Sequence, residues 1–268
     1  MRSFTDRVAV VTGAGSGIGR ATSEALARHG AHVAVVDTNE ARAADTAELI
    51  RSLGRRASTH VADVRDQSRL DAVAAEVVEI HGGCHILVNN AGVTSAGGFE
   101  DESLDDLHWI VDINVWGVVH GCRSFLPALR DAEEAHIVNL SSMVGLLGLP
   151  HNAAYSLTKG AVRSFTEALR AELVTTDIGV TVVYPGAIRT DITNAARGSH
   201  AAQLASMGNS RFAPLAMRPP GTVARRIVRA IERDQPRITV GPDARAGDLR
   251  TRLYPGRSGL IGRVTTRL

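Results

Sequence analysis

Short apolar runs alternate with amphipathic stretches along the chain, which predicts a parallel sheet covered by helices. Nearly continuous apolar character is typical of strands that are buried on both faces of a sheet. Such runs occupy residues 7–12, 32–37, 57–61, 85–89, 136–141, 179–184 and 237–240. Helical spacing of apolar positions separates them at 17–29, 40–53, 67–81, 103–130, 154–175 and 221–233. Seven strands and six crossovers predict an α/β, doubly wound sheet with helices on both faces.

The length of 268 residues is enough for one α/β domain with a large buried core. We therefore expect a single domain over residues 1–268. Residues 191–220 fit neither the strand nor the helix pattern and are expected to form a lid. Residues 243–268 are expected to form a basic tail, since six arginines and a single acid fall between Arg245 and Leu268. Such an excess is more often a solvated end than a site for an anionic partner.

Charge and composition exclude several classes of partner. The net charge is +2 and the basic residues are scattered, so no nucleic-acid partner is expected. No apolar run reaches the roughly 18 residues that a membrane span needs. Without a visible secretory signal, and with cysteines that need no pairing, a cytoplasmic protein is expected. His81, Cys84 and His85 straddle a predicted helix end and a strand, so no metal site is expected.

A glycine-rich turn, Thr-Gly-Ala-Gly-Ser-Gly-Ile-Gly at residues 12–19, follows the first strand and opens a helix. Glycines let backbone N–H groups and the helix N-terminus approach a pyrophosphate. The second strand ends in Asp37, whose carboxylate can accept hydrogen bonds from both ribose hydroxyls and repel a 2′-phosphate. The alternative for Asp37 is an ordinary strand-end cap. In this context the turn and the acid predict a Rossmann-type site for NAD rather than NADP.

Lys159 is the single lysine of the chain, against twenty-nine arginines, and it follows Tyr155 by four residues. Residues at i and i+4 share one face of a helix, so the ammonium can stabilise the phenolate and lower a pKa that starts at about 10. A lysine kept in so arginine-rich a chain indicates that a compact ammonium is needed. Tyr155 is therefore a candidate acid or base near neutral pH.

These motifs, taken in order, resemble the short-chain dehydrogenase/reductase family. The spacing of Gly13, Gly17 and Gly19 is similar to that family's T-G-x-x-x-G-x-G. The resemblance spans about residues 5–242 and continues through Asp63-Val64, Asn89-Asn90-Ala91-Gly92, Asn114, Ser142, Tyr155 to Lys159, and Pro185 to Thr190.

The resemblance implies hydride transfer to or from a nicotinamide, with Tyr155 exchanging the proton. It also implies that Lys159 holds the nicotinamide ribose and that Asn114 anchors a water that relays protons to Lys159. Adjacent strand residues face opposite sides, so only one of Ser141 and Ser142 should reach the site, and the family's spacing favours Ser142 as the hydrogen-bond donor to the substrate oxygen. The other implied cofactor contacts are Gly13, Ser16, Gly17, Ile18, Gly19, Asp63, Val64, Asn90, Ala91, Gly92, Pro185, Gly186, Ile188 and Thr190.

Two other functions compete with an NAD-dependent alcohol dehydrogenase. A 3-oxoacyl-carrier-protein reductase would usually draw on NADPH, and Asp37 argues against that choice. A dinucleotide-sensing regulator without turnover would keep the fold but would not need Tyr155 and Lys159.

Apolar residues flank the predicted site and suggest a lipophilic secondary alcohol or ketone as substrate. They are Ile192, Leu204, Met207, Phe212, Leu215 and Met217 in the lid, and Met143, Val144, Leu146, Leu147 and Leu149 before Tyr155. The alternative is that they only pack the lid onto the core. His151 is a further candidate for the pocket, and outside Arg189 and Arg197 no cation is placed to bind an anionic substrate.

Apolar surface beyond the needs of one sheet face predicts assembly, a homotetramer first and a dimer second. It is expected at Leu107, Ile110, Val111, Val115, Val118, Val162, Phe165, Leu169 and Leu173.

Overall fold

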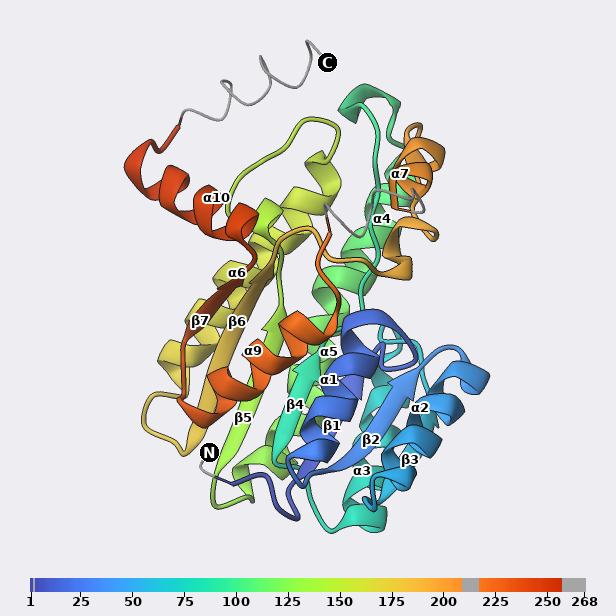
Figure 1. Ribbon diagram of the computed structural model, residues 1–268, viewed down its shortest axis with the longest axis vertical. Helices are drawn as coiled ribbons and strands as arrows, with labels where there is room; N and C mark the ends of the chain where they lie inside the picture. The colour runs from blue at the N-terminus through green and yellow to red at the C-terminus, as the bar shows by residue number, and fades with distance from the viewer. Residues whose placement is uncertain (2, 209–216, 257–268) are drawn as a thin grey trace.

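The computed structural model describes residues 1, 3–208 and 217–256, and its seven strands form one parallel sheet (Figure 1). Strand order is β3-β2-β1-β4-β5-β6-β7, so the direction of winding reverses between β1 and β4. This confirms the predicted doubly wound sheet and opens a crevice at the carboxyl ends of these strands. The strands are β1 (Val8–Thr12), β2 (His32–Asp37), β3 (Ala57–Val61), β4 (Ile86–Asn89), β5 (Ala135–Leu140), β6 (Ile178–Pro185) and β7 (Arg237–Val240).

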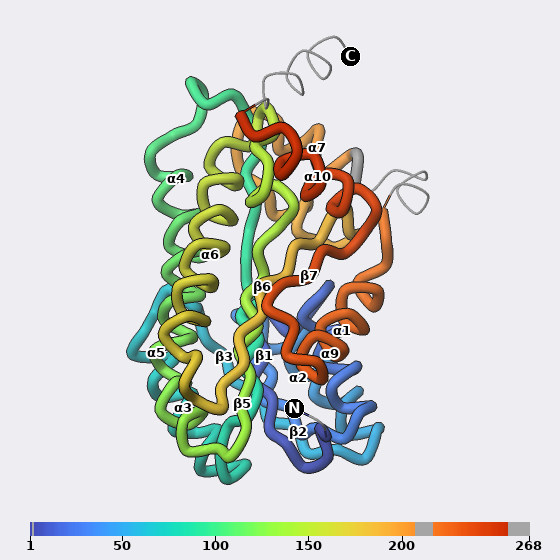
Figure 2. The backbone as a smooth tube through the Cα atoms, turned by 90° about the vertical axis from the view of Figure 1, so that its left-hand side faces the viewer, coloured from blue at the N-terminus to red at the C-terminus, as the bar shows by residue number. Residues whose placement is uncertain are grey.

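Helices cover both faces of the sheet, as Figure 2 shows in a view turned by 90°. Side chains alternate between the faces, so Ala9 and Val11 of β1 join one apolar cluster, while Val8 and Val10 join the other. The first cluster includes residues of α1 (Gly17–Arg28), α2 (Glu40–Ser52) and α9 (Gly221–Glu232). The second includes residues of α3 (Gln67–His81), α5 (Gly117–Arg130) and α6 (Ala153–Glu172).

The helix expected over residues 103–130 is interrupted. It consists of α4 (Leu104–Val111), a π-helical turn (η2, Asp112–Trp116) and α5. Ser103 begins α4 by accepting a hydrogen bond from the Asp106 N–H at 3.1 Å. Single π turns inside helices are frequent at functional sites, and this one carries Asn114.

The segments expected to lack regular structure contain helices. Residues 191–220 include a short 3₁₀ turn (η4, Asp191–Thr193) and α7 (Ala201–Gly208), while residues 209–216, with Phe212 and Leu215, lie outside the described part. Part of the expected basic tail is helical, because α10 (Pro242–Leu253) begins two residues after the end of β7. A proline at the first helical position suits such a start. Two further 3₁₀ turns are η1 (Phe99–Asp101) and η3 (Met143–Gly145).

Burial changes the argument for assembly. Five of the residues expected to be surplus lie in the chain's own core, namely Ile110, Val118, Val162, Leu169 and Leu173. They cannot supply an interface, since their apolar surface already packs against the sheet. Exposed apolar side chains on the same helices are Leu104, Trp116 and Leu157, each more than half exposed. Within the described residues, no helix is long and apolar enough to cross a membrane.

Candidate active site

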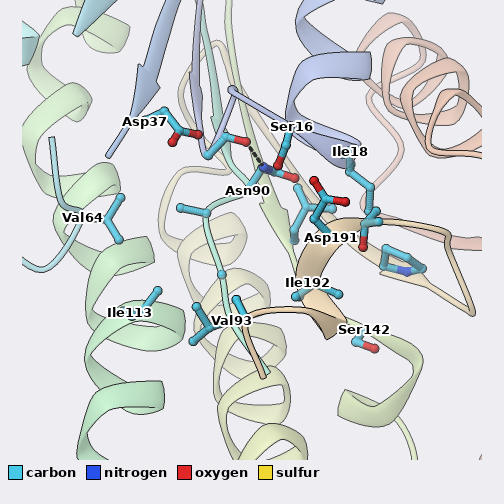
Figure 3. Close-up of a pocket in the computed structure, with 18 of the residues that line it drawn as sticks. Ser16, Ile18, Asp37, Val64, Asn90, Val93, Ile113, Ser142, Asp191 and Ile192 are labelled. Atoms are coloured by element: carbon cyan, nitrogen blue, oxygen red, sulfur yellow. Dashed lines mark hydrogen bonds between the residues drawn. The ribbon is translucent and has the colours of Figure 1, made fainter. Parts of the chain in front are cut away.

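A cavity of about 490 Å³ lies where the strand order reverses (Figure 3). It extends from the end of β2 to the first turns of α6. Of the predicted site residues, Gly19 and Asn114 do not line it. The structure brings all the others to its walls: Gly13, Ser16, Gly17, Ile18, Asp37, Asp63, Val64, Asn90, Ala91, Gly92, Ser142, Tyr155, Lys159, Pro185, Gly186, Ile188 and Thr190.

The glycine turn leaves room for an anionic group. Gly13 and Gly17 have φ of +62° and +53°, a region that favours glycine. A Cβ on Gly13 would lie 2.9 Å from the Ala91 Cα, and one on Gly19 would collide with the Gly13 carbonyl. Ser16 begins α1 without a side-chain cap, and the first turn holds no acidic residue. The free N–H groups of α1 therefore fit a pyrophosphate, as a dinucleotide would supply.

Asp37 lies at the end of β2 beside this turn, and backbone N–H groups hold its carboxylate in place. Its carboxylate accepts hydrogen bonds from the N–H of Gly15 at 2.8 Å and of Asn39 at 2.9 Å. Arg42 lies beside it on the cavity wall and pairs with Asp191 at 3.8 Å across the groove. The sequence pattern did not single out Arg42, because nothing but the fold brings α2 next to the turn.

Two polar side chains predicted to contact the cofactor also hold the surrounding loops. The Asn90 amide donates to the carbonyls of Thr12 and Gly13 at 2.9 and 3.1 Å, which ties the loop after β4 to the loop after β1. Asp63 pairs with Arg65 at 2.6 Å, and this hydrogen bond holds the pKa of Asp63 below its usual range. The Asn90 bonds therefore join two loops of the cavity wall before any ligand binds.

Tyr155 and Lys159 lie on consecutive turns of α6, with the ammonium 5.7 Å from the centre of the phenol ring. Lys159 is only 4% exposed and donates to the Leu140 carbonyl at 3.0 Å. Burial lowers the pKa of Lys159 to about 8 and raises the pKa of Tyr155 to about 12. The predicted net lowering of the Tyr155 pKa is therefore wrong for this structure, since burial outweighs the effect of the neighbouring groups.

The two serines after β5 have different partners. Ser142 forms a hydrogen bond with Tyr155 that acts to lower the phenol pKa, against the effect of burial. Ser141 instead donates to the Lys159 carbonyl at 2.7 Å. Both line the cavity, but only the Ser142 hydroxyl is paired with the phenol.

Asn114 is fully buried and clamps the loop after β4 to α6. Its amide donates to the Val93 carbonyl at 2.9 Å and to the Thr158 hydroxyl at 3.1 Å, and it accepts from the Val93 N–H at 2.8 Å. These bonds hold the amide in one orientation. A proton relay from Asn114 to Lys159 stays a prediction.

The end of the cavity away from Asp37 is apolar, but most of the residues that form it are not the ones predicted. Of the apolar residues predicted as walls whose side chains the structure describes, only Ile192 lines it. Leu146 and Leu147 line a separate cavity of about 360 Å³ beside α10. The apolar wall comes from Val93, Trp109, Ile113, Ile192 and Ala195. The i, i+4 spacing of positions 109 and 113, next to Asn114, is the signal that could have found two of them.

Other candidates from the sequence lie away from the cavity wall. His151 packs its ring 4.8 Å from the ring of His200, and neither lines the cavity. Asp243, from the segment expected to be a tail, accepts a hydrogen bond from the Ala187 N–H at 2.6 Å. It thereby holds the loop after β6, whose Pro185 and Gly186 line the cavity.

Comparisons with known proteins agree with this geometry. The family model described as short chain dehydrogenase matches residues 7–200. The putative oxidoreductase SadH of Mycobacterium tuberculosis is 36% identical over 255 residues, which are 94% of this chain and 92% of SadH. The 2,5-dichloro-2,5-cyclohexadiene-1,4-diol dehydrogenase LinX of Sphingobium indicum is 35% identical over 187 residues, 70% of this chain and 75% of LinX.

A solved structure extends the likeness to the whole fold. The short-chain dehydrogenase/reductase of Burkholderia phymatum, in complex with NAD, matches with a TM-score of 0.87 at 31% identity. The match covers 94% of this chain and 95% of the Burkholderia chain. With its parallel sheet, glycine turn and paired tyrosine and lysine, the chain belongs to the short-chain dehydrogenase/reductase family of oxidoreductases.

Proposed function

We propose that this chain is an NAD-dependent dehydrogenase that interconverts a lipophilic secondary alcohol and its ketone. The observation that carries the proposal is the order of groups along one cavity. Asp37 and Ser16 of the dinucleotide cradle lie at one end, and Val93, Ile113 and Ser142 lie at the other (Figure 3). The Tyr155 phenol, which bonds to Ser142, also lines the cavity.

Held by the glycine turn and Asp37, NAD would supply the acceptor for a hydride from the alcohol carbon, and its oxidised nicotinamide would add a positive charge to the site. Tyr155 takes the hydroxyl proton of the alcohol, or returns it to the ketone oxygen in the reverse direction. The Ser142 hydroxyl, which has one proton to donate, can stabilise the phenolate before proton transfer and donate to the substrate oxygen once Tyr155 is protonated. Lys159 lies close enough for its ammonium to stabilise the same anion.

The choice of NAD over NADP rests on Asp37. Two backbone N–H groups hold this carboxylate at the end of β2. There it can accept hydrogen bonds from the ribose hydroxyls of NAD and would repel the 2′-phosphate of NADP. The related Burkholderia enzyme, which was solved with NAD, supports the same cofactor here. This preference also argues against a 3-oxoacyl-carrier-protein reductase.

The lipophilic substrate is inferred from the wall beyond Tyr155. Among the described residues that line the cavity, the cations are Arg42 at the ribose end and Lys159 beside the phenol. Neither is available for a carboxylate or phosphate of the substrate. Val93, Trp109 and Ile113 would instead bury apolar surface, at about 0.8 kcal/mol for each CH₂ group. LinX, which acts on a chlorinated cyclohexadiene diol, supports a ring-bearing alcohol.

A matched series of secondary alcohols with NAD+ tests the proposal, with NADH formation followed at increasing chain length and ring size. Catalytic efficiency should rise with apolar surface until the cavity is filled. Tyr155→Phe is the control for a reaction that depends on the phenol. Efficiency that stays flat or is highest for a polyol would reject the substrate class. NAD binding without turnover of any alcohol would instead favour a dinucleotide-sensing regulator.

A cytoplasmic homotetramer is the remaining part of the proposal. Trp116 and Leu157 are 51% and 58% exposed on helices that flank the same side of the sheet, and pairing such surfaces would bury them. Cys84 and Cys122 are buried and unpaired, as suits a reducing compartment.

A further inference from the structure

The loop after β4 and the segment that leads into α7 lie side by side at the rim of the cavity. The Arg197 N–H donates to the Thr94 carbonyl at 3.3 Å, and the Ala96 N–H donates to the Arg197 carbonyl at 2.9 Å. The His200 N–H then donates to the Ala96 carbonyl at 2.9 Å. Gly198 has a φ of +101°, and a Cβ there would collide with the Ala96 carbonyl. The two segments can therefore approach this closely only with glycine at position 198.

The side chain of Arg197 crosses from this junction to α4. Its guanidinium pairs with the Asp106 carboxylate at 3.1 Å, and its Cζ lies 4.1 Å from the centre of the Trp109 ring. Asp106 and Trp109 are three residues apart, so they share a face of α4. The two contacts act on one planar cation, which is suited both to a carboxylate and to an aromatic face.

The indole that Arg197 contacts is also a wall of the cavity. Trp109 lines it together with Ile113, one turn further along, and with Ile192 and Ala195 from the segment before Arg197. Arg197 itself does not line the cavity. Its charge is already paired with Asp106, so it acts on the substrate end only through the tryptophan and the backbone junction.

We propose that Trp109 sets the size of alcohol that the site accepts, and that Arg197 is a positioning residue that holds the indole in place. This deepens the proposed function, on which the size selection rests. The bond between Arg197 and Asp106 fixes the direction of the guanidinium, which in turn restricts the rotation of the indole. The outer wall is then defined before substrate binds.

The first test measures the position of Trp109 without any turnover. Trp109 and Trp116 are the two tryptophans of the chain, so Trp116→Phe leaves Trp109 as the sole indole reporter. In that background, Arg197→Gln should increase acrylamide quenching of the fluorescence about twofold, because the cation no longer covers the ring. Arg197→Lys keeps the charge but not the planar guanidinium, so it should restore only part of the protection. Equal quenching in all three proteins would overturn the positioning role.

The second test measures selection with cyclic secondary alcohols of increasing ring size and NAD+. Trp109→Ala should raise the efficiency for the largest ring relative to the smallest by about tenfold or more, as a removed wall admits more apolar surface. Arg197→Gln should raise the KM for the preferred alcohol about fivefold with little change in kcat, in line with the loss of one cation–π contact and one ion pair.

A matched control deletes an exposed pair elsewhere. Arg28→Ala removes the pair with Glu24 at 2.7 Å on α1, away from the cavity, and should change neither KM nor size preference. Unchanged size preference in Trp109→Ala would overturn the inference. If the unmodified protein turned over no alcohol, the proposed function would fail, while the quenching test would still give its own answer.

Discussion

Replacing Lys159 by methionine should abolish turnover and yet make the protein more stable. Burial lowers the pKa of this lysine from 10.5 to about 8, so holding the ammonium charged at pH 7 costs about 3 kcal/mol of folding stability. Methionine has a similar length and removes this cost. It also leaves the Leu140 carbonyl without its donor, which costs about 1–3 kcal/mol. The net gain is about 1 kcal/mol, or a few degrees in Tm.

The pH dependence separates this explanation from better packing. The folded state releases the Lys159 proton first, at about pH 8, while the unfolded chain keeps its proton until about pH 10.5. Between these values the unfolded chain binds more protons, so the stability of the unmodified protein rises with pH. The advantage of Lys159→Met should therefore shrink by about 1.4 kcal/mol per pH unit in that window.

Thermal unfolding of the cofactor-free proteins at pH 7 and pH 10 measures both effects. Tyr155→Phe is the matched control, because it should also be inactive but keeps the buried ammonium. Tyr155→Phe should therefore show no increase in stability at pH 7 that becomes smaller at pH 10. A Lys159→Met protein that is less stable than the unmodified one at pH 7, or whose advantage is the same at pH 10, would refute the reasoning.

Three further predictions follow from the site and the surface. Tyr155→Phe should lose turnover while calorimetry still detects NAD binding. Lys159→Arg should be inactive because a guanidinium cannot replace the buried ammonium. Near-normal activity of either variant would contradict the assigned roles. NAD should be preferred to NADP by about tenfold or more, about 1.4 kcal/mol. Asp37→Ala should lower the NAD to NADP preference in steady-state kinetics. Adding Arg42→Ala should raise this preference again, since Arg42 is the nearby cation that a 2′-phosphate would use. Light scattering at micromolar concentration should give the mass of a tetramer that Trp116→Arg weakens, and a monomeric mass for the unmodified protein would exclude it.

The sheet could be predicted because each strand is a nearly continuous apolar run, and this pattern does not depend on how the individual side chains pack. The interruption of the helix at Asp112–Trp116 could not, since the stretches on either side keep helical spacing and a phase shift at one point looks like ordinary irregularity. Helix α10 was not predicted because its sequence is highly charged and gives no sign of the contact that holds the loop after β6. That contact, from Asp243 to the backbone of Ala187, joins residues 56 positions apart.

The catalytic residues come together as their spacing suggested, but two properties of the site depend on burial. The pKa of Tyr155 is raised, because burial of the phenol outweighs the hydrogen bond from Ser142. The apolar wall was assigned mainly to the wrong residues for a related reason. In sequence, a leucine facing the cavity and one facing the core look alike, and only Ile192 of the described candidates faces the cavity.

The π turn between α4 and α5 links two parts of the site that are otherwise separate. The wide turn takes up one extra residue, so removing that residue would restore regular winding and change the path of the chain at Ile113 and Asn114. Ile113 would then leave its place on the cavity wall, and Asn114 would lose its bonds to Val93 and Thr158. Descendants of this protein can change the identity of the residue at position 109 one substitution at a time. They cannot lose the extra residue without losing the wall and the buried clamp together.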